Sequence, residues 1–397
     1  MRHGISPKGS VNERYSNVIA SEETLRPRER GRLWAERASV LALQSVDTPS
    51  LATLQTLVNL TLYWFGAGEM VRAYMHHGIL IRALHVLGLD KLEPGRESGS
   101  NWVHQEMKGR VFWAIWLIDS FATSKTKQDH MLVGDSITTP LPSSETEFSA
   151  KKRTSKPLRL TELGATESVM GELMRAARLW YSLNLINADC RVDIGMYTCS
   201  NRNNSTARIL DLQALDSRAL AWYAALHPTL KYNRENFSIH SRLESSPAFV
   251  LIHVVYHAAL AVLYYSLVLS LASNPQSASS ISVSLLTTSS LEHANAISDI
   301  VKDLLSPEWD TTRTPAFVSY AAYIATTVQL SYLWSHSSDL AAAAKENIVT
   351  NLKLMRDVGP YWAVAEQVVS YPNACTTKQI VCQEPNIIQS TCISSLS

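Results

Sequence analysis

The 25 residues from Ala248 to Ala272 contain no Asp, Glu, Lys or Arg, and this stretch constrains the fold more than any other feature of the chain. As an α-helix rising about 1.5 Å per residue, it would be long enough to cross a bilayer core about 30 Å thick. Polar side chains, including His253 and Tyr264, lie through its middle, and no cluster of Lys or Arg flanks either end. We therefore predict the buried central helix of a folded domain, with a membrane anchor as the alternative.

The first apolar region has the spacing of a helical hairpin. Apolar residues from Leu51 to Phe65 recur every three or four positions, which predicts a helix that ends at Gly66-Ala67-Gly68. The same spacing continues from Val71 to Leu84 in a second helix, which Gly88 closes. Gly78 falls in the middle of this helix, where it would let a neighbouring backbone approach at a propensity cost of about 1 kcal/mol.

Helical spacing continues through the rest of the chain, and strand-like alternation is scarce. Further helices are predicted near residues 102–121, 166–189, 209–226, 247–271, 291–305, 315–334 and 338–369. The predicted fold is all-α: a large antiparallel bundle of packed helical hairpins with flexible Ser-rich and basic loops. We expect a polar N-terminal arm over 1–45, a helical domain over 46–370 with linkers at about 143–160 and 273–290, and a fraying tail over 371–397.

Charge and cysteine usage limit the kinds of protein this can be. Basic and acidic residues nearly cancel, at 36 against 35, which argues against a self-sufficient nucleic-acid-binding domain. The five cysteines form no Cys-x-x-Cys pair, which suits free thiols in a reducing compartment. The first thirty residues offer no apolar signal-peptide core.

The sequence lacks the motifs of the common enzyme classes. It has no Gly-x-Ser-x-Gly elbow, no phosphate-binding Gly-x-x-x-x-Gly-Lys and no Asp-Asp-x-x-Asp magnesium motif. His253 and His257 would share a helix face as zinc ligands do, but no catalytic Glu follows His253. We therefore expect no catalytic residue, no cofactor and no metal site.

Several motifs, in this order and spacing, resemble the fungal-specific transcription factor domain, the middle homology region of fungal zinc-cluster regulators. The matching residues are Gln55, Gly78, Arg82 and Gly88 in the hairpin, Glu106, Arg110, Trp113 and Asp119 in the third helix, Asp135 and Pro140 in the following loop, and Trp222, Tyr256 and His257 further on. The chain departs from the family pattern at Ser120, where an arginine is usual, and by one inserted residue after Trp222. The resemblance covers about residues 45–370.

We interpret these motif residues as mainly structural. Arg82 and Glu106 would form an ion pair across the hairpin and the third helix. Because an exposed pair contributes only about 0 to 1 kcal/mol, we expect this pair to orient the helices rather than to act on a ligand. Asp119 lies in an apolar helix and must be hydrogen-bonded or paired if it is buried.

The resemblance implies a nuclear regulator of one metabolic or secondary-metabolite gene set, whose helical domain binds a protein partner, a second copy or a small-molecule effector. No cysteine precedes Leu51, so the family's six-cysteine zinc cluster is not expected in this chain, and DNA would be reached through a partner or a missing N-terminal module. The exposed run of Lys151, Lys152, Arg153 and Lys156 is a candidate nuclear-import patch. The alternative is a helical interaction or sensor protein that kept the fold and does not act on chromatin.

Overall fold

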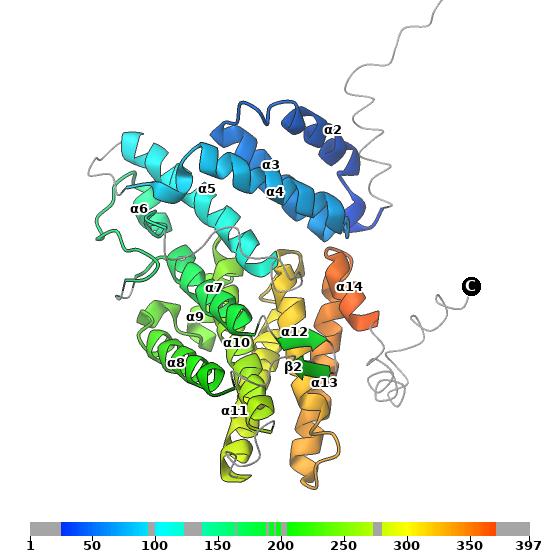
Figure 1. Cartoon of the computed structure of the whole chain (residues 1–397). Helices are drawn as coiled ribbons and strands as arrows, with labels where there is room; N and C mark the ends of the chain where they lie inside the picture. Colours follow the sequence, from blue (N-terminus) through cyan, green and yellow to red (C-terminus); the bar gives the residue numbers. More distant parts are fainter. Residues whose placement is uncertain are drawn as a thin grey trace, which may run out of the picture.

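The computed structural model describes residues 25–93, 100–122 and 137–370, apart from 163, 165, 188–189, 194–195, 200–204 and 273–279. The described chain is helical except for one two-stranded hairpin, which confirms the predicted all-α class (Figure 1). The α-helices are α2 (Arg32–Leu43), α3 (Leu51–Gly66), α4 (Met70–Val86), α5 (Ser100–Ala122), α6 (Glu145–Ser149), α7 (Val169–Ile186), α8 (Ser205–Ala224), α9 (Arg234–His240), α10 (Ser246–Ala272), α11 (Ser280–Leu304), α12 (Ala316–Leu330), α13 (Ser338–Val358) and α14 (Ala363–Ser370). The short 3-10 helices are η1 (Pro27–Glu29), η2 (Leu89–Lys91), η5 (Pro228–Leu230) and η6 (Thr311–Arg313).

Helices α3 and α4 form the hairpin that the apolar spacing predicted, and α2 packs beside α3 (Figure 1). The hydroxyl of Ser50 accepts from the backbone N–H of Thr53, which caps the first turn of α3. Gly68, with φ 84°, reverses the chain between the helices, and Gly88, with φ 62°, follows the end of α4. The glycines thus end both helices at the predicted positions.

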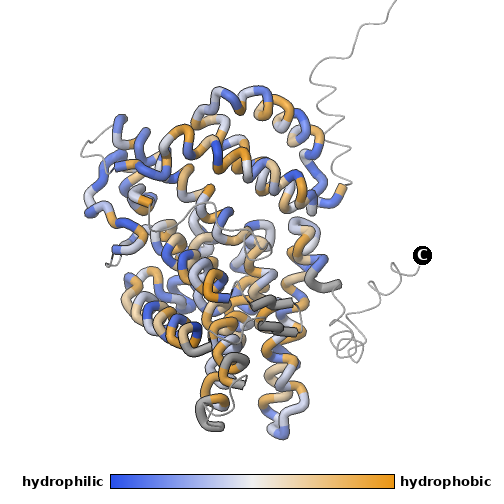
Figure 2. The backbone as a smooth tube through the Cα atoms, viewed as in Figure 1, coloured by the Kyte–Doolittle hydropathy of each residue, from blue (hydrophilic) through white to orange (hydrophobic). Residues whose placement is uncertain are grey.

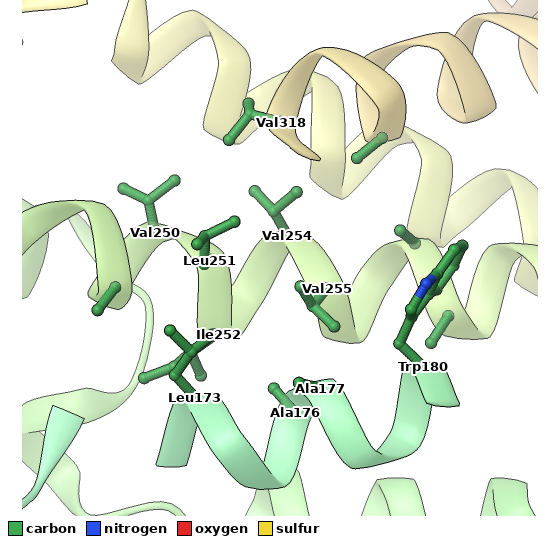
Figure 3. Packing of buried hydrophobic residues seen from close by; sticks show 14 of the residues in the cluster. Leu173, Ala176, Ala177, Trp180, Val250, Leu251, Ile252, Val254, Val255 and Val318 are labelled. Carbon is green, nitrogen blue, oxygen red and sulfur yellow. The ribbon is translucent and has the colours of Figure 1, made fainter. Parts of the chain in front are cut away.

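Helix α10 is the central helix of the bundle and packs against α7, α8, α11 and α12. Val250, Ile252, Val254 and Val255 are completely buried, and Figure 3 shows α7 on one side of them and Val318 of α12 on the other. The window long and apolar enough to span a membrane is 83% buried inside the fold. The prediction of a buried central helix is confirmed, and Figure 2 shows hydrophobic residues concentrated along the helices of this bundle.

Buried amides fix the register of α11, α12 and α13. The Gln329 side chain of α12 donates to Ser298 Oγ of α11 at 3.0 Å, and Asn351 of α13 donates to the same oxygen at 3.0 Å. Asn351 also donates to Gln329 Oε1 at 3.2 Å. Sliding one helix past another would leave these buried groups unpaired.

Some predicted boundaries were wrong. Helix α11 begins at Ser280, so the predicted linker over 273–290 is helical from that residue onward, where Ser290 Oγ donates to the Ala261 carbonyl of α10 at 3.0 Å. The predicted helix over 338–369 is two helices, because Gly359-Pro360 interrupts it and proline lacks the amide donor that a continuous helix needs.

Short elements without a long apolar period were not predicted. They include α2, which lies inside the predicted polar arm and buries only Ala35 and Ala42, together with α6 and α9. The antiparallel hairpin of β1 (Cys190–Asp193) and β2 (Met196–Cys199) was missed as well, and its register places Cys190 opposite Cys199. Tertiary contacts and local caps, rather than periodicity, define these elements.

Candidate functional site

Glu106 of α5 holds the chain that follows this helix. The residue is 8% exposed, and its Oε1 accepts from the backbone N–H and the hydroxyl of Ser143, both at 2.8 Å, and from Arg110 Nε at 3.1 Å. Arg110 also donates to Glu145 Oε1 at 2.7 Å and to the Ser143 carbonyl at 3.1 Å. Two motif residues one turn apart on α5 thus clamp one segment.

Trp113, one turn further along α5, fixes the start of the same segment. Its indole N–H donates to the Pro140 carbonyl at 2.6 Å. Thr139 connects this segment to the hairpin, because its hydroxyl donates to the Leu89 carbonyl at 2.7 Å and accepts from the Leu92 N–H at 3.1 Å. Glu106, Arg110, Trp113 and Pro140 therefore form one motif cluster that joins α5, the loop over 137–145 and the residues after α4.

The other hairpin residues of the motif lie outside this cluster. Gln55 and Arg82 are exposed, and Glu106 pairs with Arg110, so the predicted Arg82–Glu106 ion pair was wrong. A Cβ at Gly78 would meet nothing within 4 Å, so the predicted close backbone approach was wrong for the described residues. Asp135 falls outside the described residues.

Asp119 is buried, and the sequence requires a buried carboxylate at this position to be hydrogen-bonded or paired. His77 Nε2 of α4 lies 3.7 Å from Asp119 Oδ1, which is too long for a hydrogen bond but close enough for attraction. Burial lowers the pKa of His77, and the neighbouring carboxylate partly opposes this shift. Ser120, which stands where the family usually has arginine, donates to the Trp116 carbonyl at 2.8 Å within its own helix.

The basic run is only partly free. Lys151, Lys152 and Lys156 are exposed. Arg153 is half-buried: it donates to the Leu141 carbonyl at 3.3 Å and lies 3.9 Å from Glu106 Oε2. The expectation that the whole run is exposed was wrong for Arg153.

Tyr256 and His257 belong to a buried cluster of rings between α8, α10 and α11. Tyr256 stacks on Tyr223 of α8 with ring centroids 3.8 Å apart, and Tyr223 Oη lies 2.9 Å from His253 Nδ1. His257 Nδ1 lies 2.8 Å from Nδ1 of His293 of α11, so one of these nitrogens donates and the other accepts.

Burial sets the protonation of this histidine–tyrosine cluster. It lowers the pKa of His253 to about 3 and that of His293 to about 4, and it lowers the pKa of His257 well below its usual value. The three imidazoles are therefore neutral at pH 7. His253 and His257 have different hydrogen-bond partners, and the described residues contain no group of three or more His, Cys, Asp or Glu arranged to hold a metal ion.

Trp222 of α8 completes the set of motif residues. Its indole N–H donates to Glu172 Oε2 of α7 at 2.7 Å, and Glu172, 1% exposed, pairs with Arg175 at 2.9 Å. Arg175 in turn donates to the Glu162 carbonyl at 2.9 Å. Trp222 therefore links α8 to α7 through Glu172.

Comparison with known families accounts for the motif cluster. Residues 15–181 match the model of the fungal specific transcription factor domain. The chain is similar to this domain over those residues. The family is one of transcription factors and is not enzymatic. The match includes the whole motif cluster and ends in α7, so the histidine–tyrosine cluster lies beyond it.

The similarity to curated proteins extends further along the chain than the family match. The chain is 23% identical over 364 residues to the Zn(2)-C6 fungal-type transcription factor FTF1c of Fusarium oxysporum f. sp. lycopersici, covering 86% of this chain and 38% of the relative. It is also 23% identical over 432 residues to a transcriptional regulatory protein of Schizosaccharomyces pombe, covering 89% of this chain and 42% of that protein. The chain thus spans about two fifths of the length of these relatives. No solved structure matches it significantly.

Several residues that organise the domain gave no signal in the sequence. Glu147, Glu172 and His293 lie in polar or mixed stretches, and each acquires its role only from a partner brought close by folding. Glu147 is the clearest example, because its carboxylate holds Thr154 and Ser155.

Proposed function

We propose that this chain regulates transcription of a specific gene set, metabolic or secondary-metabolite biosynthetic, from the nucleus. The observation that carries the proposal is the family match over residues 15–181, inside which the motif residues Glu106, Arg110, Trp113 and Pro140 contact one another or a shared segment. Binding of a partner or of a small-molecule effector to the helical domain would shift the population of its transcriptionally competent state.

DNA would be reached indirectly or through a module outside the helical domain. The described chain is a helical bundle, and the whole sequence has a formal net charge of only +1. Several matched relatives carry the name Zn(2)-C6 transcription factor, and the chain spans 38% of the length of one of them. A zinc-cluster module in the same polypeptide or in a partner would therefore supply DNA contact.

A second copy of this chain is the protein partner that the outer face of α4 fits. Apolar side chains follow this face, with Val71 79% exposed, Met75 58% and Val86 73%. Two antiparallel copies crossing at Gly78 would approach closely, because glycine has no side chain and nothing in the same copy beyond the local helix backbone lies within 4 Å of where a Cβ would be. Tyr74 and Arg82 each lie four residues from Gly78, so the crossing places each Arg82 over the partner's Tyr74.

Sedimentation velocity tests this self-association. We expect the purified chain to dimerise at micromolar concentration. We expect Gly78→Arg, which puts a charge at the crossing, to remain monomeric with a melting temperature no lower than that of the monomeric wild type, because arginine is also a better helix former than glycine. A wild-type chain that stays monomeric throughout this range rules out the second copy as partner.

The regulatory function is tested by tagging the chain in its host. We expect the chain to accumulate in the nucleus and crosslink to promoters whose transcripts change on its deletion. Replacing Lys151, Lys152 and Lys156 by alanine should reduce nuclear accumulation, whereas replacing the exposed Lys91, Lys231 and Lys353 should not. A cytoplasmic chain without promoter crosslinks favours the alternative, a helical interaction or sensor protein.

A further inference from the structure

The carboxylate of Glu147 in α6 holds the basic loop in place. Its Oε1 accepts from the backbone N–H of Thr154 at 2.7 Å, the hydroxyl of Thr154 at 2.9 Å and the N–H of Ser155 at 2.6 Å. Its Oε2 accepts from Ser155 Oγ at 3.0 Å. Burial acts to raise the pKa of Glu147, but these four donors outweigh it and the pKa is lowered, so the group is ionised at neutral pH.

The loop presents a hydroxyl next to several cations. Lys151 has φ 53° and turns the chain out of α6, after which Thr154 and Ser155 are exposed. Lys152 and Arg153 lie three and two residues before Ser155, and Lys156 follows it. An enzyme with an acidic substrate groove would recognise this run of positive charge.

We propose that Ser155 is phosphorylated by a protein kinase with an acidic substrate groove, and that the phosphate releases the loop from Glu147. Ser155 Oγ attacks the γ-phosphorus of ATP, an Oγ–P bond forms, and the bond from that phosphorus to the β–γ bridging oxygen breaks. ADP departs, and the hydroxyl proton passes to the base of the kinase. Phosphorylation of Ser155 and release of the loop do not depend on the proposed function, because both can be measured on the purified chain without DNA or a partner.

The reaction reverses the interaction between Ser155 and Glu147. Before it, Ser155 Oγ donates a hydrogen bond to Oε2; afterwards that oxygen has no proton, and the group carries a charge of about −1.5 to −2 at pH 7. Two anions then face each other where 3.0 Å separated a donor from an acceptor. Lys152, Arg153 and Lys156 are the cations that can pair with the phosphate once the loop has moved.

Phosphorylation of the full chain with Mg-ATP and a kinase selective for basic substrates provides the first test. We expect mass spectrometry to place the phosphate on Ser155, with no incorporation in Ser155→Ala and normal incorporation in Thr154→Val. Phosphate on Thr154 or elsewhere instead of Ser155 overturns the assignment.

Hydrogen exchange tests the release, because the N–H groups of Thr154 and Ser155 both donate to Glu147. We expect phosphorylation to speed their exchange at least tenfold relative to α5, after correction with an unstructured peptide of residues 148–158. Ser155→Glu should reproduce the effect, whereas Ser155→Gln, which also lacks the hydroxyl but is neutral, should show a much smaller one. Unchanged exchange in the phosphorylated chain, or equal exchange in the two variants, overturns the release.

Discussion

Gly78 lies in the middle of α4 on its exposed side, and a Cβ at this position would have nothing within 4 Å of it. Alanine is favoured over glycine in a helix by about 1 kcal/mol. At concentrations where the chain is monomeric, we expect Gly78→Ala to raise the free energy of unfolding in urea by about 1 kcal/mol. Gly66→Ala is the contrasting variant, because its Cβ would lie 3.3 Å from the Trp362 ring; it should lower stability.

His253 makes stability depend on pH. Burial lowers its pKa to about 3, against about 6.5 when unfolded, so the unfolded chain binds more protons between these values. Its contribution is complete above pH 6.5 and is lost as the pH falls towards 3. Between pH 7 and pH 5 this amounts to about 2 kcal/mol.

Urea unfolding at pH 7 and pH 5 measures this contribution. We expect His253→Gln, which keeps a hydrogen-bonding side chain beside Tyr223, to lose about 2 kcal/mol less than the wild type over this interval. His85→Gln, at a side chain 41% exposed, should behave as the wild type. A pH dependence of stability in His253→Gln identical to that of the wild type would show that burial does not lower the pKa of this imidazole.

At the scale of one helix and its loop, Glu106 is the group on which the motif cluster depends. Truncation to alanine leaves the Ser143 N–H and hydroxyl without their acceptor in a buried site and removes one partner of Arg110. We expect Glu106→Ala to lower the free energy of unfolding by about 2 to 3 kcal/mol.

Glu145→Ala is the matched control for this element. Its carboxylate also pairs with Arg110, at 2.7 Å, but it is 54% exposed, so we expect a loss within about 1 kcal/mol. Equal losses for the two variants would show that the loop is not held by the buried carboxylate. Denaturant titration with hydrogen exchange of residues 137–145 distinguishes these outcomes.

At the scale of the whole molecule, the first described residues hold the last helix. Arg28 donates to the Gly359 carbonyl and pairs with Glu366 of α14, both at 2.7 Å, while Phe65 at the end of α3 packs near Trp362. Arg28 and its two partners lie more than 300 positions apart in the sequence, and these contacts connect the N-terminal part of the described chain to α14.

Breaking this connection tests its contribution. Arg28 is 10% exposed, and we expect Arg28→Ala to cost about 1 to 2 kcal/mol and to speed hydrogen exchange in α14. Arg26→Ala, at a residue 59% exposed with a 3.5 Å contact to the same carboxylate, should change stability by less than about 0.5 kcal/mol. No difference between the two variants would mean that α14 is held by apolar packing alone.

The sequence predicted the long elements because their patterns are local. The polar side chains inside the charge-free stretch favoured a buried central helix over a membrane anchor, which predicted the place of α10. Glycine marked the ends of α3 and α4 because only it tolerates positive φ without strain. The order of motifs was also enough to indicate the family over α3 to α7.

Tertiary structure decided which polar groups meet. Arg82 was the partner of Glu106 predicted from the sequence, and folding brings Arg110 and Arg153 to that carboxylate instead. The same holds for Glu147 with Ser155 and for His257 with His293, whose helices the sequence does not align. A hydrogen bond depends on distance and direction between atoms far apart in the chain, and a residue pattern encodes neither.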